Sequence, residues 1–83
     1  MIGCIAIEFT PGGDTLPRML AVFDREEFAL RGLRLMPCAG EGRATLRLDI
    51  GGRPSPPRVK ALERQLRAVH PSVEVIHWAG ACA

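Results

Sequence analysis

The chain of 83 residues carries 11 basic and 9 acidic residues, which gives a net charge of +2. This length suffices for one small domain with a marginal core, because a short chain buries a smaller share of its surface. So weak a charge does not by itself indicate nucleic acid or an anionic membrane as a partner. The sequence lacks a run of about 20 apolar residues and the pattern of a signal peptide, so we expect an untargeted cytoplasmic protein.

Three cysteines, Cys4, Cys38 and Cys82, form no Cys-x-x-Cys pair. An odd number of unclustered thiols fits a reducing compartment better than a disulfide framework. Such thiols are small apolar fillers in most proteins. We therefore expect neither a metal site nor a bound cofactor.

The chain begins with the patterns of a strand and a helix. Apolar side chains alternate with other residues from Ile5 to Phe9, the two-residue period of a half-buried strand. After a Gly-Gly-Asp turn, apolar residues recur at three- and four-residue steps and define one helical stripe: Leu16, Met19, Leu20 and Phe23. Asp14 or Thr15 is the expected N-terminal cap of this helix.

Two further strands are predicted in the middle of the chain. From Leu30 to Met36 the period returns to two, with Leu33 and Leu35 on one side and Arg34 on the other. The segment 39–42 reads as a glycine-bearing turn. Strict alternation from Ala44 to Ile50 then gives the clearest strand pattern of the sequence.

A second helix and a last strand complete the pattern. The run "GGRPSPP" breaks regular structure, and Ser55-Pro56 reads as a cap followed by the first helical position. The apolar stripe of this helix is Val59, Leu62, Leu66 and Val69, and His70-Pro71 ends it. Valines from Val73 onward begin a strand that runs to about Trp78.

The element order β-α-β-β-α-β predicts an α+β, ferredoxin-like fold, in which two helices cover one face of a four-stranded antiparallel sheet. We expect a single domain over residues 1–79 and a short tail over 80–83. This fold carries many functions, so each function is tested on its own residues.

A nucleic-acid-binding domain is one alternative. Arg34 lies beside the outward set of the third predicted strand, which is Arg43, Thr45, Arg47 and Asp49. This set includes no aromatic residue on which a base could stack, and tyrosine is absent from the chain. An ordinary solvated sheet face, with Glu8 and Asp49 as cross-strand partners, accounts better for these arginines.

Catalysis has no clear candidate residues. His70 is placed to act as a cation at the end of a helix, and His77 as a partly buried strand residue. The sequence shows no Ser/His/Asp set, paired carboxylates or phosphate loop. We therefore expect a protein that is not an enzyme.

The turn before the first helix is the more informative stretch. Gly12 and Gly13 precede a predicted helix N-terminus, where backbone N–H groups and the helix dipole suit a carboxylate or similar anion. The competing interpretation is that the two glycines only turn the chain.

The run Thr15–Pro37 resembles the ACT domain, specifically that of the regulatory small subunit of acetolactate (acetohydroxyacid) synthase. The matching positions are Leu16, Arg18, Met19, Val22 and Phe23 in the helix, and Leu30 and Leu33 in the following strand. The likeness in pattern continues to "VEVIHW" at residues 73–78 and covers almost the whole chain.

This resemblance implies a non-catalytic homodimer that binds and activates a large thiamine-diphosphate enzyme. Thiamine, flavin and magnesium would belong to that catalytic subunit. The resemblance also implies a site for a branched-chain amino acid between paired domains, at the first strand–helix turn and the start of the second strand. The corresponding residues here are Pro11, Gly12, Gly13, Asp14, Thr15, Leu16, Ala29 and Leu30.

The chain departs from this family at three positions. Asp14 adds a charge that opposes a ligand carboxylate, and Ala29 replaces an asparagine whose amide would bind the ligand, so we expect weak or absent effector binding. Glu27 stands where a glycine would end the first helix. A stand-alone amino-acid-sensing ACT dimer is the alternative within the fold. In either case we expect self-association, through a sheet edge or the first helix.

Overall fold

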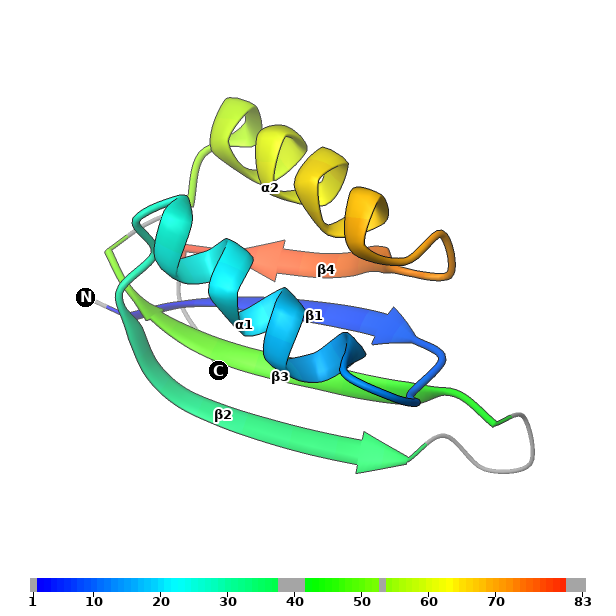
Figure 1. Cartoon of the computed structure of the whole chain (residues 1–83). Coiled ribbons are helices and arrows are strands. Elements are labelled where there is room, and N and C mark those ends of the chain that lie inside the picture. The colour runs from blue at the N-terminus through cyan, green and yellow to red at the C-terminus, as the bar shows by residue number, and fades with distance from the viewer. Residues whose placement is uncertain (1, 38–41, 53, 81–83) are drawn as a thin grey trace.

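The computed structural model describes residues 2–37, 42–52 and 54–80. Its elements in chain order are β1 (Ile2–Phe9), α1 (Thr15–Arg25), β2 (Leu30–Pro37), β3 (Ala44–Gly51), α2 (Pro56–Val69) and β4 (Glu74–Ala79). The four strands form one antiparallel sheet in the order β2-β3-β1-β4, and both helices lie on the same face of it (Figure 1). The predicted ferredoxin-like architecture is confirmed.

The core lies between the two helices and the central strands β1 and β3. Alternate residues of these strands point to the helices and are buried, as the two-residue period predicted. Burying one such aliphatic side chain contributes about 1.5–3 kcal/mol. The core consists of Ile5, Ile7, Phe9, Met19, Val22, Phe23, Phe28, Ala44, Leu46, Leu48, Ile50, Leu62, Leu66 and Val73.

Helix α1 buries a slightly different face from the predicted one. Met19 and Phe23 are fully buried as expected, and Val22 joins them, whereas Leu16 and Leu20 are only partly buried. Helix α2 packs against the Val22 side of α1, so this side is covered. Leu16 and Leu20 pack against the margin of the core.

The C-terminal end of α1 closes with a left-handed residue that is not glycine. Glu27 has φ of 62°, its N–H donates to the carbonyl of Asp24 (3.0 Å), and the N–H of Phe28 donates to the carbonyl of Phe23 (2.9 Å). These two bonds are those of a Schellman motif, and the rings of Phe23 and Phe28 pack edge to face with centroids 5.8 Å apart. Glu27 thus takes the backbone conformation that the missing glycine would have supplied.

Several element ends differ from the predictions. Strand β1 begins at Ile2 rather than Ile5, and β4 begins at Glu74 rather than Val73. Asp14 and Ser55 occupy the N-cap positions of the two helices, but neither side chain makes a capping hydrogen bond. The predicted turn at 39–42 and the tail at 80–83 lie largely outside the described residues, as do Cys38 and Cys82.

Candidate functional site

The turn between β1 and α1 is built on glycine conformations. Gly13 has φ of 53°, a left-handed conformation that favours glycine, and the N–H of Thr15 donates to the carbonyl of Gly12 (3.2 Å). A Cβ atom at Gly12 or Gly13 would meet nothing within 4 Å, so backbone conformation rather than crowding favours glycine there. The turn therefore presents its backbone openly to solvent.

The carboxylate of Asp14 lies at this turn and is well exposed. Its nearest cation is Arg18, one turn along α1, with Nη1 4.0 Å from Oδ1. A pair this long, with the two side chains 56% and 77% exposed, contributes little to stability. Asp14 consequently leaves a negative charge without a close cation at the N-terminus of α1, where a carboxylate ligand would have to sit. Thr15 is buried, and Leu16 is half-buried.

The other half of the predicted effector site lies at the opposite end of the sheet. Leu30 pairs with Ile50, which pairs with Gly3 near the start of β1, whereas the turn follows Phe9 at the end of β1. From Gly3 to Phe9 the strand spans about 20 Å, at about 3.3 Å per residue. One copy of the chain therefore does not bring Ala29 and Leu30 to the Gly12–Asp14 turn.

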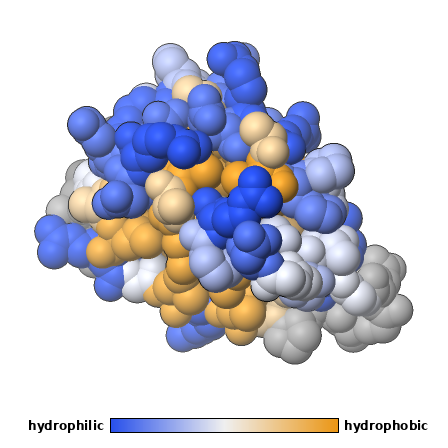
Figure 2. All heavy atoms as spheres, in the orientation of Figure 1, coloured by the Kyte–Doolittle hydropathy of each residue, from blue (hydrophilic) through white to orange (hydrophobic). Residues whose placement is uncertain are grey.

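Strand β2 carries an apolar surface that neither helix covers. Leu30, Leu33 and Leu35 face the helix side of the sheet, since their partners on β3 are the core residues Ile50, Leu48 and Leu46, yet they are 40–48% exposed. Figure 2 shows hydrophobic atoms gathered over β2 and the neighbouring side of α1. We call these three leucines the β2 face. Sequence periodicity predicted the common side of Leu33 and Leu35 but not their exposure, and the register shift between Leu30 and Gly32 brings Leu30 to the same side.

Strands β4 and β2 form the two edges of the sheet. At β4, Glu63 of α2 accepts the N–H of Val75 (3.1 Å), and Arg67 donates from Nε to the carbonyl of Val73 next to the strand (3.4 Å). Strand β2 forms the other edge of the sheet and pairs with β3 on one side. A free strand edge is a template for pairing with another strand. The open edge and the β2 face thus coincide.

The predicted strip of arginines, Arg34, Arg43 and Arg47, lies on the face of the sheet away from the helices. Arg43 lies 2.9 Å from Glu8 through Nε and Oε1, and its Nη2 donates to the carbonyl of Ser72 (3.1 Å), so it joins β3 to β1 and to the turn before β4. The predicted pairing of Glu8 with an arginine is present, and that arginine lies directly before β3. Arg34 and Arg47 remain neighbours across β2 and β3.

The two histidines lie at the C-terminal end of α2 and on β4. Nδ1 of His70 accepts the N–H of Ser72 (3.1 Å) and lies 2.7 Å from the Ser72 hydroxyl. His70 is the C-cap residue of α2, at the helix end where the sequence placed it. His77, expected to be partly buried, is exposed on the sheet face, opposite Ala6.

Metal binding and membrane spanning have no support in the described part of the chain. Cys4 is free and buried, on the side of β1 opposite Ile5. No group of three potential metal ligands comes together among the described residues. Of the helices that the structure describes, none is long and apolar enough to cross a membrane.

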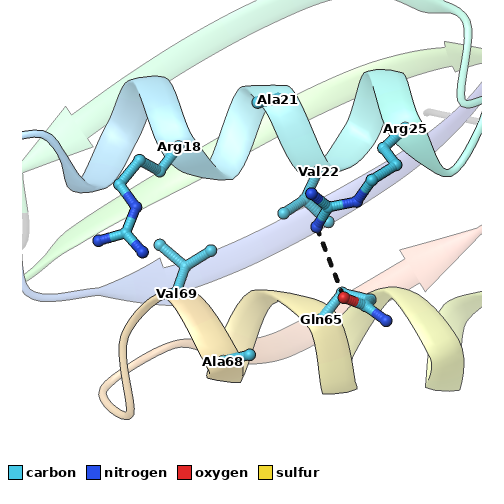
Figure 3. Close-up of a pocket in the computed structure, with 7 residues that line it drawn as sticks. All are labelled: Arg18, Ala21, Val22, Arg25, Gln65, Ala68 and Val69. Atoms are coloured by element: carbon cyan, nitrogen blue, oxygen red, sulfur yellow. Dashed lines mark hydrogen bonds between the residues drawn. The ribbon is translucent and has the colours of Figure 1, made fainter.

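A shallow groove of about 260 Å³ runs between the two helices on the outer side of the molecule. It is lined by Arg18, Ala21, Val22, Arg25, Gln65, Ala68 and Val69. Figure 3 shows Arg18 and Arg25 reaching from α1 toward α2, with Val22 and Val69 between the helices. Arg25 donates from Nη2 to Gln65 at 3.5 Å, a long and exposed hydrogen bond. The sequence analysis did not predict this groove, because its two walls come from helices 40 residues apart.

The ACT domain of a GTP pyrophosphokinase from Chlorobium tepidum is similar to this chain in structure, with a TM-score of 0.62 and 20% identity over 92% of this chain and 97% of that one. The fold is ferredoxin-like, of the ACT type. The C-terminal domain of the MgtC protein from Mycobacterium tuberculosis is also similar (TM-score 0.69, 21% identity, 96% of this chain and 86% of that one). No protein-family profile and no curated protein matches the chain.

A larger protein contains the same fold as a part. A formyltetrahydrofolate deformylase from Burkholderia mallei matches 95% of this ACT-type chain with a TM-score of 0.62 and 15% identity. The chain spans only 27% of that deformylase. At these identities the likeness concerns the fold alone.

Proposed function

We propose that the chain is a non-catalytic regulatory domain that works as a dimer and senses a small molecule. In its more specific form, the proposal is a regulatory small subunit of acetolactate synthase, which activates a thiamine-diphosphate catalytic subunit. The observation that carries the proposal is the uncovered β2 face at the open edge of the sheet. A second copy of the chain is the partner that fits both features at once.

Pairing two β2 strands about a two-fold axis would complete the candidate effector site. Antiparallel strands place the start of one strand beside the end of the other. The end of β2 pairs with Ala44 of β3, which pairs with Phe9 just before the Gly12–Asp14 turn. Leu30 of one copy would therefore lie at the same end of the joint sheet as the turn of its partner.

The dimer is tested by placing a charge on the β2 face. We expect a dimer for the wild type at about tens of micromolar, the range of a weak dimer, and a monomer for Leu33→Arg, measured by light scattering. Ile76→Arg is the matched control, since Ile76 is an equally exposed apolar residue (47%, against 48% for Leu33) on the opposite edge strand. A strictly monomeric wild type, or a dimer that only Ile76→Arg disrupts, would contradict the β2 interface.

Effector binding is expected to be weak or absent. First-turn N–H groups favour a carboxylate by about 0.3–1 kcal/mol. The charge of Asp14 opposes the ligand, and the amide lost at Ala29 forfeits about 1.5–3 kcal/mol. Calorimetric titration of valine, leucine and isoleucine into the protein measures the resulting affinity. Sub-millimolar binding that Gly13→Val abolishes would show an intact site, whereas binding created by Asp14→Gly with Ala29→Asn would support a weakened one.

The identity of the partner enzyme rests on the resemblance in the Thr15–Pro37 run. Met19, Val22 and Phe23 are core residues, so packing alone accounts for their match. Leu16, Arg18, Leu30 and Leu33 are partly or largely exposed, and the fold does not require them. These four positions are therefore the part of the resemblance that supports a functional relationship.

The specific form is tested with the acetolactate synthase catalytic subunit of the same organism. We expect addition of the chain to raise its activity, and Leu33→Arg to reduce that effect if the dimer is the active form. Amino-acid binding by the isolated dimer, with no effect on any acetolactate synthase, would instead support a stand-alone sensor. The proposed dimer and the proposed role in acetolactate synthase are thus tested by separate experiments, and either can be refuted without the other.

A further inference from the structure

The groove between α1 and α2 combines a small, apolar floor with cationic ends. Ala21 and Ala68 are exposed and Val22 and Val69 lie between the helices, so another backbone can approach closely. Arg18 and Arg25 stand two helical turns apart at its α1 wall. Their only described polar partners are distant, Asp14 at 4.0 Å and Gln65 at 3.5 Å. Both guanidinium groups are therefore available to a stronger acceptor.

A second copy of the chain does not fit this groove. Two α1 helices packed antiparallel about Ala21 would place Arg18 of one copy opposite Arg25 of the other, and like charges in contact are unfavourable. The β2 face is the self-complementary surface, and it lies on the other side of α1. The occupant of the groove must supply negative charge.

A nucleic-acid backbone or an anionic membrane also fits poorly. Asp14, one helical turn before Arg18, and Asp24, next to Arg25 in sequence, repel a continuous row of phosphates. The floor between the arginines is apolar and concave, which offers nothing to a ribose or a lipid headgroup. Two separate carboxylates on an otherwise small and apolar surface match the groove better.

We propose that this groove docks an acidic helical segment of a partner protein. At 1.5 Å per residue, Arg18 and Arg25 are separated by about 10.5 Å along the axis of α1. Two glutamates seven residues apart on one face of the docking helix have the same separation, and alanines between them match the floor. The helix lies in the groove as a third helix beside α1 and α2, at the usual axial distance of about 8–10 Å. This surface is separate from the β2 face and does not depend on effector binding.

The proposal is tested with a labelled, alanine-rich helical peptide that carries two glutamates seven residues apart. Fluorescence anisotropy at low salt measures its binding to the full chain, and the same peptide with glutamines is the reference. We expect the glutamate peptide to bind at least about ten-fold more tightly, a preference lost in Arg18→Glu with Arg25→Glu. Arg34→Glu, on the opposite face of the sheet, should leave the preference unchanged.

Further variants separate groove binding from general attraction to charge. Ala68 is exposed on the groove wall, so Ala68→Glu should weaken binding of the glutamate peptide. A version of the peptide with lysines in place of the glutamates should bind the Arg18→Glu/Arg25→Glu variant. Equal affinity for the glutamate and glutamine peptides, or an equal loss with Arg34→Glu, would overturn the proposal. Binding of single-stranded DNA in place of the peptide, lost in the same double variant, would overturn it in favour of nucleic acid.

Discussion

Glu27 shows how a single residue can keep a helix end that its sequence does not favour. The left-handed conformation is costly for a residue with a side chain, yet the Schellman bonds, the Phe23–Phe28 contact and Arg58 all hold it in place. Arg58 donates to the carbonyls of both Glu26 (3.1 Å) and Glu27 (3.3 Å). The motif is therefore imposed by its surroundings.

Replacing Glu27 by glycine should stabilise the protein. The change removes the left-handed penalty, so we expect the free energy of unfolding to rise by about 1 kcal/mol and Tm by about 4–8 °C. Urea and thermal unfolding measure both. Glu27→Ala is the control, because it removes the carboxylate but keeps the unfavourable conformation. A gain with alanine as large as with glycine would assign the effect to charge.

Gly3 is a second position where one residue decides the local backbone. A Cβ there would lie 2.6 Å from Cδ of Pro54 and 2.8 Å from the carbonyl oxygen of Gly52. Since these are ring and backbone atoms, Gly3→Ala should cost about 1–3 kcal/mol in unfolding free energy, the range of overpacked sites. Gly51→Ala, whose Cβ would have 3.3 Å to the nearest atom, is the milder comparison on β3. Equal losses in the two variants would contradict this steric argument.

At the scale of the elements, Arg58 connects the start of α2 to the C-terminal end of α1. This residue lies in the first turn of α2, bonds the carbonyls of Glu26 and Glu27 directly after α1, and places its guanidinium 4.4 Å from the centroid of the Phe28 ring. The planar guanidinium can bond two carbonyls and stack on a ring simultaneously, whereas a lysine ammonium cannot.

Arg58→Lys should therefore destabilise the protein although the charge is kept. We expect a loss of about 1 kcal/mol, the net value of a typical hydrogen bond, in urea unfolding. Arg64→Lys, on the exposed face of the same helix, is the matched control and should leave stability within about 0.5 kcal/mol of the wild type. If both variants behave alike, the α1–α2 connection does not depend on the guanidinium.

The elements also show where sequence reasoning succeeds and where it stops. The order of strands and helices followed from periodicity, because each half-buried element has a single covered face. The buried face of α1 was predicted imperfectly, since the contact of Val22 with the neighbouring helix cannot be read from one helix alone. The start of β1 was missed because Gly3 has no side chain and Cys4 is buried on the other side of the sheet.

At the scale of the whole molecule, the candidate effector site also depends on contacts that sequence periodicity does not reveal. Its residues were named from the resemblance, but the structure places Ala29 and Leu30 far from the Gly12–Asp14 turn in one copy. A complete site would need the turn of one copy and Leu30 of another. The arrangement of two copies cannot be predicted from the periodicity of one sequence. The groove between the helices was missed because its cations and small residues come from two distant segments.

A dimer built on the β2 face predicts that stability depends on concentration. Association removes the three exposed leucines from water, and a partner that binds only the folded chain raises Tm by mass action. We expect the Tm of the wild type to rise between about 1 and 100 µM, a range that brackets a micromolar dissociation constant. The Tm of Leu33→Arg should not change over this range, and a constant wild-type Tm would argue for a monomer.

The pairing of β1 with β4 has a consequence for how the molecule responds to mechanical load. Cys4 pairs with Ala79, so the beginning of β1 and the end of β4 lie side by side at the same end of the sheet. Because antiparallel hydrogen bonds run perpendicular to the strands, force applied at these two points acts along the bonds and loads them one after another. The domain should therefore open under tension like a zipper from β4, at low force, while β3 and β2 stay paired.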